Sequence, residues 1–215
     1  MRVYFWEIDE SKHDEWLDKL KRIAPADSFD RAMRFRFPID RMLTLCGEAL
    51  VRWLACGQLK VENNNLAFCK NEFGKPYLKY HPNFHFNISH TRDALAVAVS
   101  DTEVGVDIER IKAAPMDVAH RFFSLPEREF ITQSADPDKS FYEIWVRKEA
   151  YIKFLGKGLS IGLTSFNTLN PEIKKMTAVF EKAGYLVSVC GLGQEPVSIC
   201  DADTFYSDIL NQTRI

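Results

Sequence analysis

The order in which helical and strand-like segments follow one another is the strongest constraint on how this chain can fold. Apolar residues recur at helical spacing from about Asp40 to Cys56, and again from about Asp138 or Ser140 to Leu155. Short strand-like runs accompany both helices, and this order recurs after about residue 104 without a residue-level repeat. We therefore predict an α+β fold of two pseudo-symmetric halves, residues 1–104 and 105–215, each a small antiparallel sheet packed on a long helix.

The individual strands are predicted from apolar and β-branched runs that lie between turn signals. The first strand covers Val3 to Ile8. One compact antiparallel sheet is expected from three runs: Phe84 to Ser89, Ala94 to Ser100 and Val104 to Glu109. Strands completing the second half are expected near Phe166, Ala178 to Phe180, Tyr185 to Cys190 and Val197 to Cys200. Short helices are expected around 116–123 and 126–133, and Gly156 should end the second long helix, because glycine is a common helix stop.

The composition favours an ordinary globular protein. With 46% hydrophobic residues over 215 positions, and no low-complexity linker, the two halves can bury a good core and should pack closely. A formal net charge of −2 gives no whole-molecule attraction to nucleic acid or to an anionic membrane. The N-terminus is too short and too acidic for a signal peptide, and no stretch approaches the roughly 20 apolar residues of a membrane span. Five cysteines without a CxxC pair argue against disulfides and a zinc knuckle, so we expect a cytoplasmic protein.

Two acidic residues interrupt the apolar run from Val104 to Glu109. Asp107 and Glu109 are two positions apart, so on a strand both carboxylates point to one face and could share one hard cation such as Mg²⁺. The alternative is a strand with one solvated face. Gly105 favours the first interpretation, because glycine within a strand often marks the close approach of a ligand or of another backbone.

Two other segments contain groups suited to phosphate. Glu149 and Lys153 lie four residues apart on one helical face, although a plain surface salt bridge explains that spacing equally well. Ser89 and His90 close a strand and enter a turn, where a hydroxyl and an imidazole can reach a phosphate, but a lone histidine is more often structural. Each of these motifs is weak when it is considered alone.

Taken together and in order, the motifs are specific. They are Gly74-Lys75-Pro76, Phe86-Asn87-Ile88-Ser89-His90, Gly105-Val106-Asp107-Ile108-Glu109, and Trp145 through Lys153 with Gly156-Lys157-Gly158-Leu159-Ser160. This series resembles the 4′-phosphopantetheinyl transferase family, specifically its surfactin-type, double-length class. The resemblance covers roughly residues 1 to 166.

The resemblance implies a reaction and its participants. Enzymes of this family transfer the phosphopantetheine arm of coenzyme A to a serine of an acyl or peptidyl carrier protein and release adenosine 3′,5′-bisphosphate. By motif, Asp107, Glu109 and Glu149 would hold Mg²⁺, and Lys153 would contact phosphate oxygens. Lys75 and Pro76 would border the adenine, and Ser89 and His90 would bind the 3′-phosphate. We expect Glu149 to be the general base, directly or through a metal-bound water, because it lies on a different element from the other two carboxylates.

The chain departs from the family pattern at the expected 3′-phosphate site. Arg31 matches a basic position, but Ser28 and Leu43 occupy two other positions that are usually basic. Fewer charges there should weaken coenzyme A binding unless Arg34 and Arg36 compensate.

Three further expectations concern partners and alternative functions. The segment from Ile111 to Ile131 would dock the carrier protein, with Met116, Phe122 or Phe123 offering apolar contact or lying in the core. A single double-length chain should supply both sides of the active site, which lies between the halves, so we expect a monomer. The alternatives are a non-catalytic coenzyme A or nucleotide-binding homologue and a metal-dependent phosphohydrolase.

Overall fold

The computed structural model describes residues 1–192, 197–202, 205, 207 and 208. The first part contains β1 (Arg2–Glu7), α1 (His13–Ile23), α2 (Ala26–Ala32), α3 (Pro38–Leu59), β2 (Phe68–Lys70), β3 (Pro76–Leu78), β4 (His85–Thr91) and β5 (Ala94–Ser100). The second contains β6 (Val104–Arg110), α4 (Met116–Phe122), α5 (Leu125–Thr132), α6 (Pro137–Leu155), α7 (Pro171–Met176), β7 (Thr177–Lys182), β8 (Tyr185–Gly191) and β9 (Ser198–Asp201). No helix of the described residues is long and apolar enough to cross a membrane.

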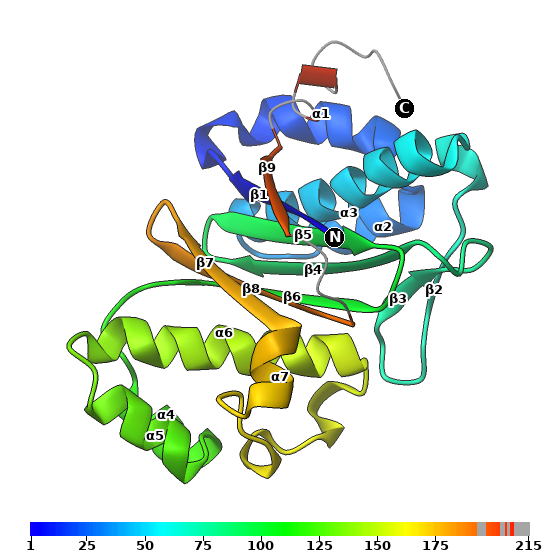
Figure 1. Cartoon of the computed structure of the whole chain (residues 1–215). Helices are drawn as coiled ribbons and strands as arrows, with labels where there is room; N and C mark the ends of the chain where they lie inside the picture. Colours follow the sequence, from blue (N-terminus) through cyan, green and yellow to red (C-terminus); the bar gives the residue numbers. More distant parts are fainter. Residues whose placement is uncertain (193–196, 203–204, 206, 209–215) are drawn as a thin grey trace.

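The elements form four layers, with helices outside and two sheets between them (Figure 1). The first sheet has the strand order β4-β5-β1-β9, and α1, α2 and α3 cover its outer face. The second has the order β6-β8-β7 and packs against α6, while β2 and β3 form a separate two-stranded sheet. The predicted α+β architecture of two halves, each with a sheet on a long helix, is confirmed.

The central strand β5 shows why the layers stack in this way. Its leucine and valines, Leu95, Val97 and Val99, belong to the core beneath α3, and its alternating alanines belong to the core between the two sheets. Because side chains alternate along a strand, one sequence serves two different cores. The small alanines leave room for Val104, Val106 and Ile108 of β6 and for Tyr185 of β8.

Two of the strand predictions were wrong in their pairing. The expected sheet of three consecutive strands does not form, because β4 pairs with β5 but β6 pairs antiparallel with β8. The apolar face of β6 packs in the core between the sheets, opposite the alanines of β5, so β6 lies across that core from β5 and pairs with β8. The run near 197–200 is a strand, but it pairs parallel with β1 in the first sheet instead of completing the second half. Phe166 is not in a strand and follows a short 3₁₀ turn, Leu163–Ser165.

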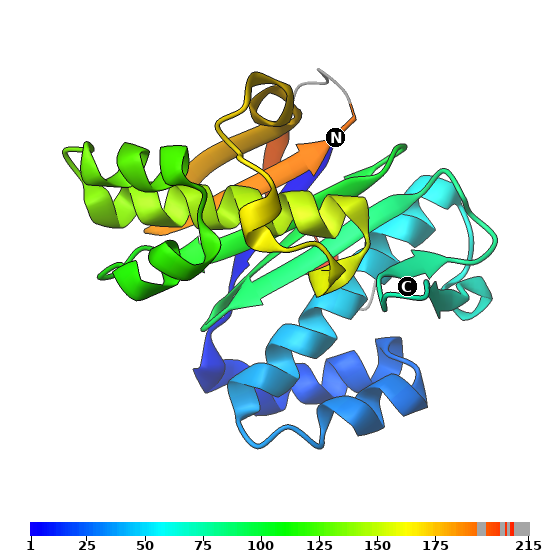
Figure 2. The same cartoon turned by 90° about the horizontal axis from the view of Figure 1, so that it is seen from below.

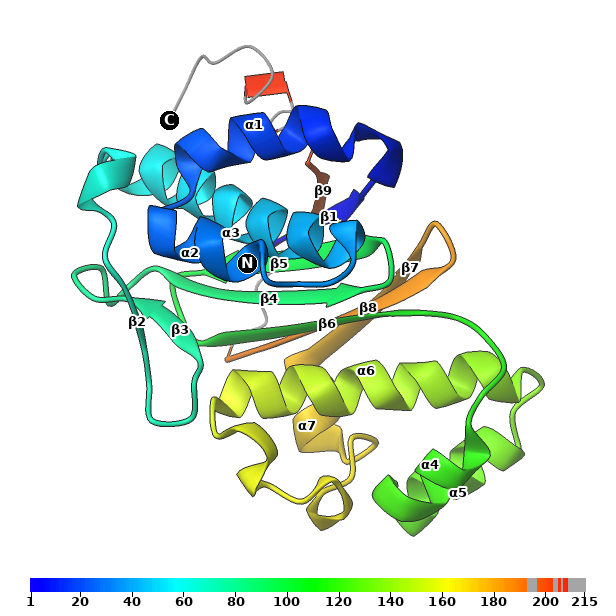
Figure 3. The ribbon, with the colours of Figure 1, turned by 180° about the vertical axis from the view of Figure 1, so that it is seen from behind.

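The boundary between the two sheets is a seam between β4 and β6, which lie side by side (Figure 3). The backbone amide of Val106 donates to Asn87 Oδ1 at 2.8 Å, so a side chain takes the place of a backbone carbonyl there. Further along, Ser89 contacts Asp107 and Thr91 contacts Glu109. Since these contacts advance in the same direction on both strands, β4 and β6 run parallel. The seam therefore brings polar side chains of the first sheet against the acidic face of β6.

Candidate active site

The acidic residues of β6 face α6. Val104, Val106 and Ile108 point into the core between the sheets, so Asp107 and Glu109 lie on the opposite face with Gly105. A Cβ atom on Gly105 would overlap Ala150 O and Phe154 N of α6 and would lie 2.9 Å from Lys153 C. The close approach that this glycine permits is therefore to the α6 backbone. In Figure 2, α6 (yellow-green) crosses in front of the strands.

Asp107, Ser89 and Lys153 form one hydrogen-bonded cluster. Lys153 Nζ lies 2.7 Å from Asp107 Oδ1 and 2.7 Å from Ser89 Oγ, and Ser89 Oγ donates to Asp107 Oδ1 at 2.8 Å. Asp107 and Ser89 are buried, whereas the Lys153 side chain is 27% exposed. Lys153 of α6 thus pairs with Asp107 of β6. The surface salt bridge to Glu149 that the sequence allowed is not among its ion pairs within the described residues.

Three carboxylates come together at this cluster. Burial, reinforced by the charges of Asp107 and Glu109, holds the pKa of Glu149 above its ordinary value, and the Lys153 ammonium opposes that rise. Burial and the charge of Asp107 likewise raise the pKa of Glu109, while its hydrogen bond from Thr91 opposes the rise. The three acids repel one another in a partly buried space, which is the electrostatic condition that a bound cation would relieve.

The donor set of the cluster fits a hard divalent cation. Asp107 Oδ2 is buried, and no described residue donates a hydrogen bond to it. An uncompensated carboxylate oxygen is costly in a protein interior, and Mg²⁺ binds one or two carboxylates together with phosphate oxygens and water. Within the described ranges no three or more His, Cys, Asp or Glu side chains are already arranged to hold a metal. A hard cation together with the oxygens of a phosphorylated ligand would satisfy the unpartnered Asp107 Oδ2.

His90 lies at the open side of the cluster. Its ring is exposed, and partial burial together with the nearby Lys153 ammonium lowers the pKa of His90, whereas Asp40 in the first turn of α3 opposes that shift. The imidazole is therefore within electrostatic range of Lys153 in the last turn of α6 and of Asp40 in the first turn of α3. Ser89 is buried, and its hydroxyl is engaged by Asp107 and Lys153.

Lys75, which the resemblance places beside the adenine, makes three polar contacts in this structure. Its ammonium bonds Glu103 at 2.7 Å and the carbonyls of Val104 at 3.1 Å and Phe154 at 3.3 Å. These contacts fasten the start of β6 to the end of α6. The lysine therefore serves first as a structural clamp for the two elements that carry the carboxylates.

A groove of about 600 Å³ lies between α2, α3 and the strands β2, β3 and β4. Arg31 and Pro76 line it, together with Ser28, Thr44 and Ile88. Ser28 Oγ accepts a hydrogen bond from Arg31 Nη2 at 2.6 Å, so the serine at a usually basic position holds the neighbouring arginine. Leu43 is fully buried in the core and cannot contribute to the groove.

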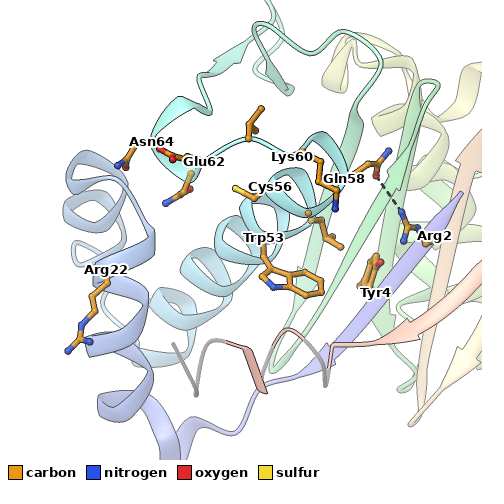
Figure 4. Close-up of a pocket in the computed structure, with 13 residues that line it drawn as sticks. Arg2, Tyr4, Arg22, Trp53, Cys56, Gln58, Lys60, Glu62 and Asn64 are labelled. Atoms are coloured by element: carbon orange, nitrogen blue, oxygen red, sulfur yellow. Dashed lines mark hydrogen bonds between the residues drawn. The ribbon is translucent and has the colours of Figure 1, made fainter. Parts of the chain in front are cut away.

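A larger groove, of about 900 Å³, lies at the C-terminal end of α3 (Figure 4). Arg2, Tyr4 and Trp53 line it, with Lys60 and Glu62 on the segment after the helix. None of the nine residues that the sequence suggested for binding or catalysis is among those lining it. Size alone therefore does not identify the functional site of this protein.

The segment expected to dock a carrier protein is partly exposed. Phe122 of α4 is 39% exposed, and Leu125 of α5 is 58% exposed. Phe123 is buried and packs against Phe141, so of the two phenylalanines only Phe122 is open to a partner. Met116 is partly buried against the same core.

Sequence reasoning missed two sets of residues around the site. Thr91 donates to Glu109 Oε2 at 3.0 Å, and the alternation of Asn87, Ser89 and Thr91 along β4 was the signal that could have revealed it. Lys148, next to Glu149, is fully buried and lies 2.8 Å from the equally buried Glu127. Nothing in the sequence marked this pair, because the partners are 21 positions apart on different helices.

Comparisons with known proteins bear on the same two parts of the chain. The family model described as 4′-phosphopantetheinyl transferase superfamily matches residues 103–200, and the model described as 4′-phosphopantetheinyl transferase, N-terminal, matches residues 6–102. The 4′-phosphopantetheinyl transferase psf-1 of Bacillus pumilus is 38% identical over 161 residues, which cover 74% of this chain and 69% of the relative. The 4′-phosphopantetheinyl transferase Sfp of Bacillus subtilis (strain 168) is 32% identical over 169 residues, which cover 78% and 75%.

Proposed function

The chain belongs to the 4′-phosphopantetheinyl transferase superfamily, and we propose that it transfers the 4′-phosphopantetheine group from coenzyme A to a serine of an apo acyl or peptidyl carrier protein. The second product would be adenosine 3′,5′-bisphosphate. One observation supports this proposal above the others: the strand β6 and the helix α6 bring Asp107, Glu149 and Lys153 together beside β4.

A divalent cation has a defined place in this proposal. Asp107, Glu109 and Glu149 would hold Mg²⁺ beside the pyrophosphate of coenzyme A, where the ion would neutralise charge on the phosphate oxygens. The unpartnered Asp107 Oδ2 supports this assignment.

Glu149 is proposed as the general base. The serine oxygen of the carrier attacks the β-phosphorus, a new P–O bond forms, and the bond to the bridging pyrophosphate oxygen breaks. Glu149 accepts the serine proton, and the bisphosphate leaves with the bond electrons. In the metal-free protein, burial and the charges of Asp107 and Glu109 raise the pKa of Glu149, so its carboxylate binds a proton more readily than that of a free glutamate. Lys153 would place its ammonium against the phosphate oxygens.

Coenzyme A would lie along the groove of about 600 Å³ between α2, α3 and the strands β2, β3 and β4. Arg31 and Pro76 line this groove, and His90 is exposed at the open side of the cluster, so the arginine and the imidazole are proposed to bind the 3′-phosphate. Residues 1–104 would thus bind the nucleotide and residues 105–215 would supply the metal site and the carrier surface. We further propose a cytoplasmic monomer, since one chain supplies both sides of the site.

The intact mass of a carrier protein tests this function. The chain is incubated with coenzyme A, Mg²⁺ and a panel of apo-carriers, and at least one carrier should gain the mass of one phosphopantetheine. Cleavage of coenzyme A without a mass gain would support a phosphohydrolase, and binding without cleavage would support a non-catalytic homologue. Either result would overturn the transferase assignment.

The 3′-phosphate site is tested separately. Coenzyme A and 3′-dephospho-coenzyme A are compared by calorimetric titration. Coenzyme A should bind more tightly, because only coenzyme A carries the 3′-phosphate that Arg31 and His90 are proposed to bind. Equal affinities would remove both residues from the proposed 3′-phosphate site.

A further inference from the structure

The side chains that cross from β4 to β6 form a regular series. Asn87, Ser89 and Thr91 occupy alternate positions of β4, so all three lie on one face of that strand. Asn87 accepts from the Val106 amide and fixes the register of the two strands, since its side chain is buried. The next two donate hydroxyl groups to the acids of β6, with Ser89 Oγ 2.8 Å from Asp107 Oδ1 and Thr91 Oγ1 3.0 Å from Glu109 Oε2.

Each hydroxyl engages one oxygen of its carboxylate. A carboxylate that accepts a fixed hydrogen bond at one oxygen loses rotational freedom, and its second oxygen is left for another partner. At Asp107 the second oxygen is the buried Oδ2, to which no described residue donates. At Glu109, two residues further along β6, Oε2 accepts the hydrogen bond from Thr91.

We propose that Thr91 is a positioning residue that orients Glu109 toward the divalent cation. The inference rests on the proposed function, because it takes Asp107, Glu109 and Glu149 as the residues that hold the ion. The inference adds to the proposed function, because it assigns part of the cation affinity of Glu109 on β6 to the Thr91 hydroxyl on β4 of the first sheet. The packing of the two sheets along the seam then determines whether the metal site is complete.

Thr91 tests this arrangement more cleanly than Ser89. Ser89 also contacts Lys153, so removing its hydroxyl would disturb an ammonium and a carboxylate together. Among the described residues, the hydrogen bond that the Thr91 side chain makes is the one to Glu109. Thr91→Val keeps the shape and removes the hydroxyl, Thr91→Ser keeps the hydroxyl, and Thr102→Val is a matched control on the exposed turn between β5 and β6.

The measurement is the binding of Mn²⁺ to the full chain loaded with coenzyme A, followed by electron paramagnetic resonance of the free ion. Loss of an outer hydrogen bond to a metal ligand typically weakens metal binding by about 10–100-fold, and we expect Thr91→Val to fall in that range. Thr91→Ser and Thr102→Val should bind like the wild type. In transfer assays, Thr91→Val should need more Mg²⁺ for half-maximal rate but should regain turnover when Mg²⁺ is saturating.

The outcomes separate this inference from the proposed function. A wild type that binds Mn²⁺ and modifies a carrier, combined with unchanged Mn²⁺ affinity in Thr91→Val, would overturn the inference alone. A wild type that binds no Mn²⁺ would overturn the metal site and this inference together. If Thr91→Val does not fold, Thr91→Ser still decides, because weak Mn²⁺ binding by a variant that keeps the hydroxyl would contradict the proposal.

Discussion

The two long helices, α3 and α6, cover their sheets in similar ways but bury different chemistry. Both bury an arginine that pairs with a glutamate four residues earlier, Arg52 with Glu48 at 3.0 Å and Arg147 with Glu143 at 3.1 Å. The rest of the buried face of α3 is apolar, whereas α6 also buries Lys148 and carries Glu149 and Lys153 to the acids of β6.

The helices also differ in how closely they approach a strand. Gly47 of α3 faces the side chain of Ile88, whose Cγ2 would lie 3.1 Å from an added Cβ. At α6 the glycine is on the strand, and Gly105 lies directly against the helix backbone. The two layers thus differ in geometry, because α3 meets its strand through a side chain, whereas α6 and β6 meet backbone to backbone. The close contact places the catalytic candidates of α6 within reach of Asp107.

The largest expected effect concerns Glu149 itself. Glu149→Gln should lower turnover by about 10²–10⁴-fold, the usual contribution of a general base, while coenzyme A still binds. The measurement is the single-turnover rate of carrier modification at saturating Mg²⁺, with the exposed Glu172→Gln on α7 as control. An unchanged rate in Glu149→Gln would exclude Glu149 as the general base and would remove this difference between α6 and α3.

The next effect concerns the fully buried lysine of α6, Lys148, which has no counterpart on α3. Lys148 Nζ contacts Glu127 and donates to the carbonyls of Leu163 and Phe166 at 2.7 and 2.9 Å. Lys148→Met should lower the free energy of unfolding by about 3–5 kcal/mol, because the buried Glu127 loses its counter-charge and keeps, among the described residues, only its hydrogen bonds from Ser124 and Thr168.

The control for this change is on α3. The volume-conserving Leu50→Met in its apolar core should cost less than about 1.5 kcal/mol. Adding Glu127→Gln to Lys148→Met should recover part of the loss. Denaturant unfolding measures all three variants, and equal losses in the two single variants would mean that the buried pair does not distinguish the helices.

The close approach of α6 is tested by the two glycines. Gly105→Ala should cost about 1–3 kcal/mol or more, since the overlapping atoms belong to the helix backbone and α6 must move. Turnover should fall as well, because a misplacement of 1 Å at a catalytic group can cost about 10²-fold.

In Gly47→Ala, the gain of up to about 1 kcal/mol in helix propensity opposes the contact with Ile88, so little change is expected. Thermal unfolding and transfer rate are measured on both variants. Similar behaviour of the two glycine variants would contradict the difference between the contacts.

The smallest effect is a pH dependence of stability in the metal-free protein. The folded state holds the pKa values of Glu109 and Glu149 above the ordinary 4.5, so in the window just above 4.5 it binds more protons than the unfolded chain. The free energy of unfolding therefore falls as the pH rises through that window. Glu149→Gln should remove part of this decline. Unfolding midpoints in chelator between pH 4.5 and neutrality measure the effect, and identical slopes in wild type and variant would count against repulsion among the carboxylates.

Much of the architecture could be predicted from local patterns. The helices α3 and α6 were placed to within a few residues, and Gly156 ends α6 in a left-handed conformation as expected. The pairing of β6 with β8 and of β9 with β1 was not predictable, because a strand's residue pattern shows which of its faces is buried but not which other strand it will pair with. The metal, nucleotide and carrier roles of the individual residues stay predictions.

The sequence by itself determined the two long helices, most of the strands and the family, since apolar periodicity and ordered motifs are properties of neighbouring residues. The tertiary structure decided which polar groups meet. It joined Lys153 to Asp107, Thr91 to Glu109 and Lys148 to Glu127, three pairs that are separated by 18 to 46 positions in the chain. Hydrogen bonds and ion pairs act only at short range, so the packing of α6 on β6 and of β4 beside β6 had to be in place before these partners could be identified.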